Sequence, residues 1–237
     1  SSFLLNSGNL NMNNINVENF IYGIQDGSTR SGGTAGTYGT ISNCKLDTGG
    51  QDAMDFCEGE VDTIENCEIL TKGYGIIIGH DYQGGSINLI ENCTLENSDW
   101  NAIPLVFVKH SGAIETIKEC NITHHDASAI SVQEAKPSDG YPAGRIGIID
   151  GGFYIGGGSY GSAITSGGTI DHVLGGIFIG GWDAVYNRGN INTISGGSFF
   201  GNESALTNGG AIDSLEGGYY KTATNSNWIV VEDGSTC

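Results

Sequence analysis

One phrase, TIENCEIL at 63–70, returns almost unchanged as LIENCTLE at 89–96, and this repetition constrains the fold more than any other feature. With the cysteine of each phrase as position zero, the register continues along the chain in steps of 21 to 32 residues. An internal period of this length is typical of solenoid proteins, in which each repeat packs only on its neighbours. The zero positions are Ile15, Cys44, Cys67, Cys93, Cys120, Gly152, Gly176, Gly197 and Gly218.

Two columns of apolar residues keep the same register. Position −3 is always Met, Ile, Val or Leu, position +2 is always aliphatic or aromatic, and the residue between zero and +2 is mostly polar. Side chains that alternate in this way indicate β-strands. A further pair of small and aliphatic residues, eight to eleven residues after zero, predicts a second strand in each repeat. These pairs are Gly23-Ile24, Ala53-Met54, Gly75-Ile76, Ala102-Ile103, Ala129-Ile130, Ala163-Ile164, Ala184-Val185 and Ala205-Leu206.

A single repeat cannot bury its apolar face, whereas stacked repeats pair their strands in parallel at about 4.8 Å and close a continuous core. We therefore predict an all-β protein, a right-handed parallel β-helix (solenoid) of about nine coils. Leucine-rich repeats are excluded because the chain has no LxxLxL run and no helical segment between strands. A propeller would need four strands in each blade of about 40 residues.

The whole chain, 1–237, is expected to form one β-helix domain. Irregular coils with cysteine at position zero occupy about 9–148, regular coils with a Gly-Gly pair occupy about 149–220, and 221–237 forms the C-terminal end. Because the sequence begins and ends within the repeat pattern, we expect it to be a segment of a larger protein.

The repeated cysteines predict an inward ladder of buried, reduced thiols, because stacked coils place their zero positions above one another. Cysteine packs as a small apolar residue, and parallel Cβ directions suit a disulfide poorly. Zinc is not expected, since the chain has no CxxC pair. Cys57 and Cys237 lie outside this ladder.

The phrases GGTIDHVLGGIFIG, GNINTISGGSFFG and GGAIDSLEGGYYK resemble the right-handed parallel β-helix repeats of bacterial surface proteins, in particular adhesin-like proteins of anaerobic Gram-positive gut bacteria. The wider pectin-lyase-like superfamily also includes polysaccharide lyases and glycoside hydrolases. The resemblance covers about residues 9 to 220 and rests on core and turn positions. It implies the fold and does not by itself fix the activity.

The charge balance excludes some classes of partner. Nine Lys and Arg against 27 Asp and Glu give a formal net charge of −18. Nucleic-acid binding needs basic patches that neutralise phosphates, and anionic membrane surfaces would repel this chain. No apolar run reaches the ~18 residues of a spanning helix. We expect no nucleic-acid partner and no membrane insertion.

The cysteine-containing coils carry longer and more polar turns than the Gly-Gly coils, and loops on a rigid scaffold often carry function. The turns before the second strand should form a stripe roughly 15 Å long, at about 4.8 Å per coil; it also includes Lys72 and His124, and Trp182-Asp183 could extend it. Aromatic rings beside carboxylates suit a sugar ligand, although Trp100 could instead cover the edge of the core. The predicted ligand-binding residues are Asp52, Tyr74, Asp99, Trp100, Asn101, His125 and Asp126.

An enzymatic alternative depends on carboxylates in the same coils, because a glycosidase needs two carboxyl groups about 5 to 9.5 Å apart. The tripeptide GHD at 79–81 is similar to the Gly-His-Gly element of polygalacturonases, with an aspartate in place of the last glycine. That family's Asp-Asp pair and Arg-Ile-Lys element are absent. A lyase needs a basic residue, and these coils offer Lys72, Lys109 and Arg145. The catalytic candidates are Asp55, His80, Asp81, Lys109 and His110.

The function expected from these features is that of a module of an exported bacterial surface protein, serving as an adhesin-like scaffold or a glycan-binding surface. Its partners would be a glycan or host-surface ligand and other domains of the same polypeptide, and its location extracellular or on the cell surface. The alternatives are a polysaccharide lyase or glycoside hydrolase, and a purely structural spacer. No cofactor and no tightly bound metal is expected, which leaves only low-affinity surface Ca²⁺.

Overall fold

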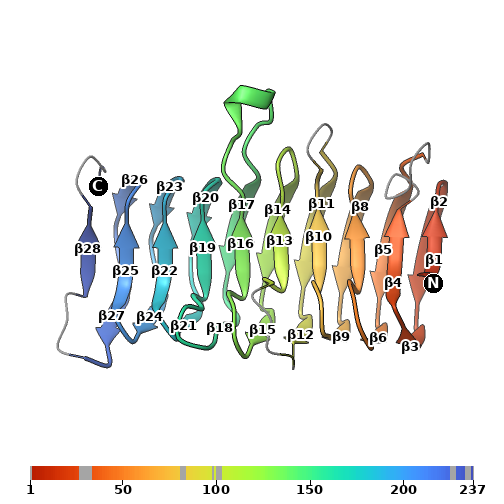
Figure 1. Ribbon diagram of the computed structural model, residues 1–237, viewed down its shortest axis with the longest axis horizontal. Helices are drawn as coiled ribbons and strands as arrows, with labels where there is room; N and C mark the ends of the chain where they lie inside the picture. The colour runs from red at the N-terminus through yellow and green to blue at the C-terminus, as the bar shows by residue number, and fades with distance from the viewer. Residues whose placement is uncertain are drawn as a thin grey trace.

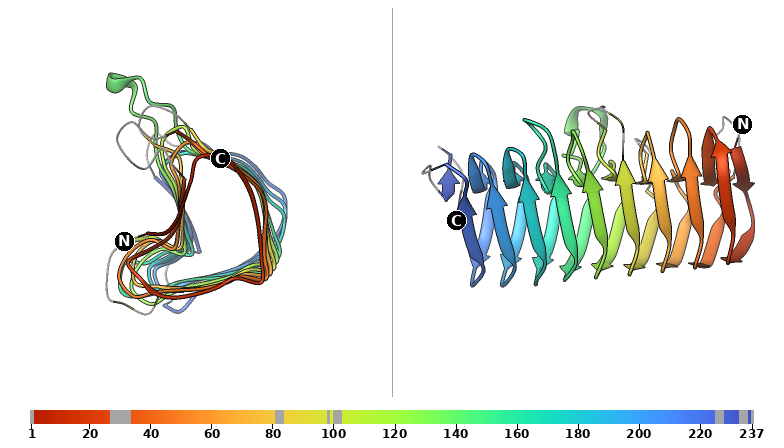
Figure 2. Two further views of the ribbon diagram at one scale, coloured as in Figure 1. Left: turned by 90° about the vertical axis from the view of Figure 1, so that its right-hand side faces the viewer. Right: turned by 90° about the horizontal axis from the view of Figure 1, so that it is seen from below.

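The computed structural model describes residues 2–26, 34–80, 84–97, 99, 103–224, 228–232 and 236. Over these residues the chain winds as a right-handed parallel β-helix, and each coil contributes one strand to each of three parallel sheets (Figure 1 and Figure 2). The predicted fold class is therefore confirmed, with about nine coils stacked along the long axis of the molecule.

The three sheets are named A, B and C in the order in which each coil meets them. Sheet A contains β1 (Ser2–Asn6), β4 (Tyr22–Asp26), β7 (Met54–Phe56), β10 (Ile76–Ile78), β13 (Val106–Val108), β16 (Ile130–Val132), β19 (Ile164–Ser166), β22 (Asp183–Asn187), β25 (Ser204–Asn208) and β28 (Ile229–Val231). Sheet B contains β2 (Asn9–Asn13), β5 (Thr37–Ser42), β8 (Glu60–Glu65), β11 (Ser86–Glu91), β14 (Ala113–Lys118), β17 (Arg145–Asp150), β20 (Thr169–Val173), β23 (Asn190–Ile194) and β26 (Ala211–Leu215). Sheet C contains β3 (Asn16–Phe20), β6 (Lys45–Thr48), β9 (Glu68–Thr71), β12 (Thr94–Asn97), β15 (Asn121–His124), β18 (Phe153–Gly156), β21 (Ile177–Gly180), β24 (Ser198–Gly201) and β27 (Tyr219–Thr222). One 3₁₀ turn, η2 (Pro137–Asp139), tips the loop that protrudes between β16 and β17 (Figure 1).

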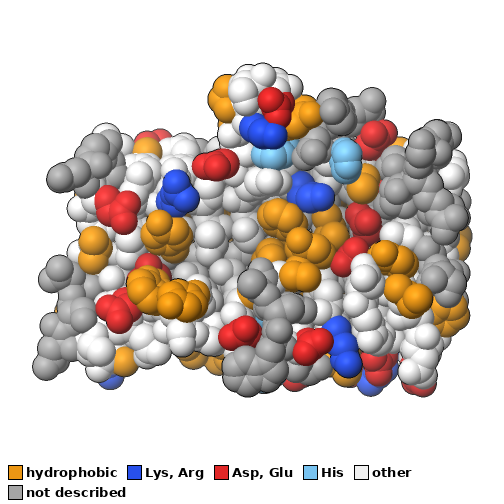
Figure 3. All heavy atoms as spheres, in the orientation of Figure 1, with side chains coloured by type: hydrophobic (Ala, Val, Ile, Leu, Met, Phe, Trp, Pro, Cys, Tyr) orange, Lys and Arg blue, Asp and Glu red, His pale blue; other side chains and the backbone are white. Residues whose placement is uncertain are grey.

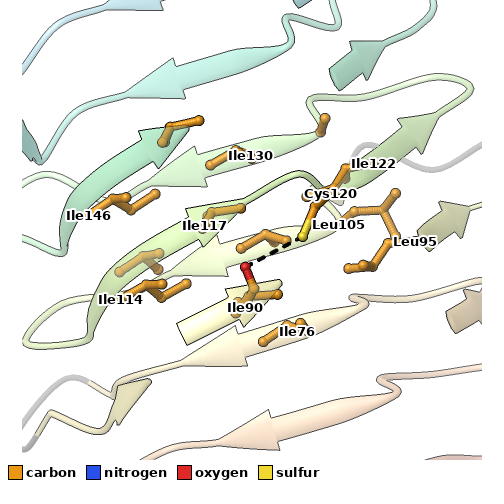
Figure 4. Packing of buried hydrophobic residues seen from close by; sticks show 14 of the residues in the cluster. Ile76, Ile90, Leu95, Leu105, Ile114, Ile117, Cys120, Ile122, Ile130 and Ile146 are labelled. Carbon is orange, nitrogen blue, oxygen red and sulfur yellow. Dashed lines mark hydrogen bonds between the residues drawn. The ribbon is translucent and has the colours of Figure 1, made fainter. Parts of the chain in front are cut away.

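The strand register confirms the two columns read from the sequence. Position −3 forms an unbroken ladder in sheet B, from Met12 paired with Ile41 to Ile194 paired with Leu215. Position +2 does the same in sheet C. Both columns point inward and build the apolar core, part of which is shown in Figure 4.

The column of sheet A was predicted correctly in most coils and wrongly in one. Ala102-Ile103 was assigned to this column, but Val106 is the residue that pairs with Ile76 on one side and Ile130 on the other. The turn after β12 is longer than its neighbours, so the strand begins three residues later than the repeated Ala-Ile phrase suggests.

The cysteines form the buried ladder that the repeat predicted, and they lie at the corner between sheets B and C. Cys44, Cys67, Cys93 and Cys120 are buried free thiols, and each packs one coil above the last. The residue before each of these cysteines turns the chain in a left-handed conformation, with φ between 50° and 53°. Asparagine adopts this conformation more readily than most residues, which explains the Asn-Cys pairs. The thiol of Cys120 lies 3.6 Å from the carbonyl oxygen of Ile90 (Figure 4).

The Gly-Gly coils replace the cysteine ladder with a stack of aromatic rings. At position zero Gly176 and Gly197 have φ of 118° and 106°, a region that favours glycine. The space that a side chain would fill is taken by the residue at +2: a Cβ on Gly197 would lie 3.1 Å from the ring of Phe199. The rings of Tyr154, Phe178, Phe199 and Tyr220 stack with centroids 4.9 to 5.0 Å apart.

The outer surface of sheet A is hollowed, whereas the other two sheets present flatter faces. In the end-on view of Figure 2 the wall formed by sheet A bends inward between two sets of turns. One set leads from sheet C into sheet A, and the other leads from sheet A into sheet B. Among the described residues, no helix has the length and apolar character needed to cross a membrane.

Candidate functional site

The outer face of sheet A combines concavity with most of the polar and aromatic residues selected from the sequence. Figure 3 shows this face, with hydrophobic side chains along its middle and acidic side chains beside them. One side chain from the middle of each strand from β4 to β28 points outward. In coil order these are Gln25, Asp55, Ile77, Phe107, Ser131, Thr165, Tyr186, Thr207 and Val230.

Three surface hollows follow one another along this face. The first has a volume of about 440 Å³ and lies beside β7 and β10. The second, of about 190 Å³, lies beside β16. The third, of about 540 Å³, lies over β19, β22 and β25, and Tyr160 borders both the second and the third. We call this row of hollows the sheet A groove.

The first hollow collects three of the predicted ligand-binding residues. Asp52, Tyr74 and Asp99 line it together with Lys72. The ring of Tyr74 stacks on that of Phe107, with centroids 5.4 Å apart and planes inclined by 9°. Burial raises the pKa of the Asp52 carboxyl and outweighs the opposing hydrogen bond from the backbone N–H of Tyr74. Trp100 and Asn101, also predicted here, lie outside the described residues.

A ladder of buried polar side chains holds the turns that border this hollow. The Thr71 hydroxyl donates to the carbonyl oxygen of Gln51 at 2.8 Å, and the Asn97 amide donates to the carbonyl oxygen of Gly73 at 2.9 Å. Asn97 also accepts the backbone N–H of Asp99 at 2.8 Å. These bonds satisfy turn backbone that would otherwise be buried without partners. The rim of the groove is therefore fixed from inside the β-helix.

The adjacent residues His124 and His125 have different environments, and of these three neighbouring residues Asp126 is the one that lines the groove. The prediction that placed His124 on the surface stripe is wrong, because it is fully buried in the polar ladder and its Nδ1 accepts the backbone N–H groups of Asp126 and Ala127. His125 is exposed, and its Nε2 lies 3.3 Å from a carboxylate oxygen of Glu96 on the outer face of sheet C. Asp126 lines the second hollow.

Asp55 points outward from β7, the strand beside the first hollow, and its carboxyl has a strongly raised pKa. Burial, reinforced by the nearby carboxylate of Asp52, raises its pKa to about 6. The positive charge of Lys109 opposes the shift at both aspartates, so the two carboxyls and the ammonium share one electrostatic environment. The thiol of Cys57 lies 3.5 Å from an Asp55 oxygen, and burial raises the pKa of this thiol.

The remaining catalytic candidates are more scattered. His80 is half-buried at the turn after β10. His110 is buried, and its ring packs at 5.6 Å from that of Tyr141 in the protruding loop. Arg145 belongs to sheet B, where it pairs with Glu115 and Asp171. Asp81 lies outside the described residues.

The third hollow contains an aromatic pair, Tyr160 and Trp182, of which the sequence analysis identified one member. Trp182 was considered as an extension of the stripe, whereas Tyr160 was not singled out. Their rings stack with centroids 5.3 Å apart, and both are exposed, Tyr160 by 81 % and Trp182 by 40 %. Tyr160 stands in a glycine-rich turn of a regular coil, GGGSYGS at 156–162, and an aromatic residue in such a turn was the available signal.

In the described part of the chain no cluster of three or more His, Cys, Asp and Glu side chains is arranged to hold a metal ion. Comparisons with models of protein families, with curated proteins and with solved structures found no match for this chain. The site must therefore be interpreted from its own chemistry.

Proposed function

We propose that this protein is a carbohydrate-binding module that holds an extended glycan chain in the sheet A groove. The observation that carries the proposal is the row of hollows along one face, with the exposed Tyr160–Trp182 pair in the third and the Tyr74–Phe107 pair at the first. Sugar rings stack on aromatic faces, and polar groups bond their hydroxyls. A linear polymer is the ligand that matches a linear site.

The setting we propose is an exported bacterial surface protein with an adhesin-like role. An acidic, solvent-facing solenoid is suited to display outside the cell, and a net charge of −18 favours solubility. The resemblance of the repeat phrases to bacterial surface proteins supports the same setting. In this role the groove would attach its bearer to a glycan of the host or of the surrounding matrix.

The test is binding of purified protein to a glycan array, followed by affinity measurement on the best ligand. Tyr160→Ala and Trp182→Ala should each weaken binding about ten-fold or more, since one stacked aromatic ring contributes on the order of 1–2 kcal/mol. Tyr219→Ala is the matched control, because Tyr219 is 55 % exposed on the outer face of sheet C. Absence of any glycan ligand would leave the spacer role as the better account.

A polysaccharide lyase or hydrolase is the second candidate, and one observation favours it. Asp52 and Asp55 share one environment in which the pKa of Asp55 rises to about 6, as befits a general acid. The carboxylate of Asp26 raises the pKa of Asp55 further, and the ammonium of Lys109 opposes the rise. If the groove is catalytic, Asp55→Asn should abolish release of reducing ends or of unsaturated products. Asp47→Asn, in β6 of sheet C, the strand that precedes β7, should leave activity intact.

A further inference from the structure

The third hollow differs chemically from the rest of the groove. Its lining includes Asp183, Glu203 and Glu232 beside the Tyr160–Trp182 pair, and no lysine or arginine is among the described residues that line it. Glu203 and Glu232 are exposed, whereas Asp183 is buried. A hollow that groups acids with exposed rings and lacks a lining cation is electrostatically suited to a positively charged guest.

Asp183 is an unusual residue for its position in the coil. It is 1 % exposed, and neither of its oxygens receives a hydrogen bond of normal geometry from the described residues. Burial raises the pKa of its carboxyl, and weak hydrogen bonding from Thr207 and Ser204 only partly offsets that rise. A buried carboxylate without good partners lowers stability. A hydrogen-bond donor on a bound ligand would therefore stabilise the Asp183 carboxylate.

The fold itself does not require an aspartate at this position. Asp183 pairs with Ser204 in the next coil, and Ser162 stands in the same place in the preceding coil, two residues before Ile164, which pairs with Val185. A serine therefore serves the backbone equally well on both sides. The aspartate is a local departure from the repeat, and Asp183 is one of the residues that line the hollow.

We propose that the third hollow binds the protonated amino group of an amino-sugar residue, with Asp183 as its principal anion. This inference rests on the proposed glycan-binding function and specifies its ligand class. The pyranose ring would stack on Trp182 and Tyr160, and the ammonium, which has three N–H donors, would reach Asp183 and the carboxylates of Glu203 and Glu232. Each N–H of an ammonium group can donate to a different carboxylate oxygen. The site therefore does not need the closely converging ligands that a metal ion requires.

The same charges select against acidic polysaccharides. Uronate or sulfate groups entering this hollow would meet three acidic residues and, in the described part of its lining, no cation. Like charges at close range disfavour binding. A partly or fully deacetylated amino-sugar polymer is therefore the expected partner. A polyuronate is not expected to bind.

The experiment compares calorimetric binding of a β-linked glucosamine hexamer with that of its N-acetylated counterpart, near pH 6 and at two salt concentrations. The free-amine hexamer should bind about ten-fold tighter, because a charge-assisted hydrogen bond is stronger than a neutral one, and the difference should shrink at high salt. Asp183→Asn should abolish the difference. Asp213→Asn removes an equal charge from the exposed face of sheet B and should preserve it.

Each outcome has one consequence. Equal affinity for the two hexamers, with no effect of Asp183→Asn, would overturn the amine site while leaving glycan binding intact. Binding of neither hexamer nor any other glycan would overturn the proposed function itself. Stronger protection by Ca²⁺ than by the amine in thermal unfolding would also overturn the inference. If Asp183→Asn fails to fold, Glu203→Gln tests the same contact from the exposed rim, and an unchanged preference would count against the site.

Discussion

Phe178 and Phe199 stack face to face in the core, with ring centroids 4.9 Å apart and ring planes inclined by 6°. Each belongs to a coil whose position zero is glycine, Gly176 or Gly197, and each ring fills the space beside that glycine. In the N-terminal coils the same volume is divided between a cysteine at zero and an aliphatic residue at +2. The two halves of the β-helix thus fill the same interior volume with different pairs of side chains. Because protein interiors are packed as densely as organic crystals, a smaller residue at position zero requires a larger one at +2.

The aromatic stack should dominate the stability of the C-terminal coils. Phe199→Ala should lower the free energy of unfolding by about 3–5 kcal/mol, because it removes a fully buried ring and leaves a cavity. Phe200→Ala is the matched control, since this neighbour in β24 is only half-buried on the outer face. Urea unfolding followed by circular dichroism measures both. A similar loss for the two variants would contradict the inward stack.

The fold was predictable because a solenoid repeats its packing, and repetition exposes the inward positions in the sequence. The columns at −3 and +2 were therefore correct in every coil. The error at Ala102-Ile103 shows the limit. A longer turn shifts the strand without altering the apolar phrase, so Val106 could be recognised only from its pairing.

The arrangement of the candidate site could be predicted only in part. Asp52, Tyr74 and Asp99 meet around one hollow as expected. His124 was wrongly assigned to the surface. Strand alternation would have placed it inward, because it stands two residues after the buried Ile122. The Tyr160–Trp182 pair depends on how two glycine-rich turns bend toward each other, and no spacing rule describes that.

The ladder thiols should be inert in the native protein. Cys44, Cys67, Cys93 and Cys120 are at most 2 % exposed, and a buried thiol reacts slowly because reagent cannot reach it. Labelling with a thiol reagent, read by peptide mass spectrometry, should leave all four unmodified until denaturant is added. In denaturant the full set of 6 cysteines should react. Rapid native labelling of any ladder cysteine would show that the coils open.

Asp55 should make the protein more stable in mild acid. Its pKa is raised from 3.8 to about 6, so between these values the folded state binds more protons than the unfolded state. Stability therefore falls as pH rises from about 4 to 6, by at most about 3 kcal/mol, and levels off above. Asp55→Asn should remove this component, and Asp99→Asn, an exposed neighbour, should retain it. Urea unfolding at pH 4.5 and 7 provides the comparison, and an unchanged slope in Asp55→Asn would contradict the assignment.

His124 should contribute the opposite pH dependence. Burial lowers its pKa below the ordinary 6.5, so the unfolded state binds the proton more readily, and the stability present above pH 6.5 is lost as pH falls. His124→Asn should suppress this loss, because Asn97 in the preceding coil already accepts a turn N–H in the same manner. His124→Ala leaves the N–H groups of Asp126 and Ala127 without their acceptor, at a cost of about 1–3 kcal/mol for each that stays buried. His125→Asn, at the exposed neighbour, should change neither quantity. If His124→Asn kept the wild-type acid sensitivity in unfolding measurements between pH 5 and 7, another group would have to carry it.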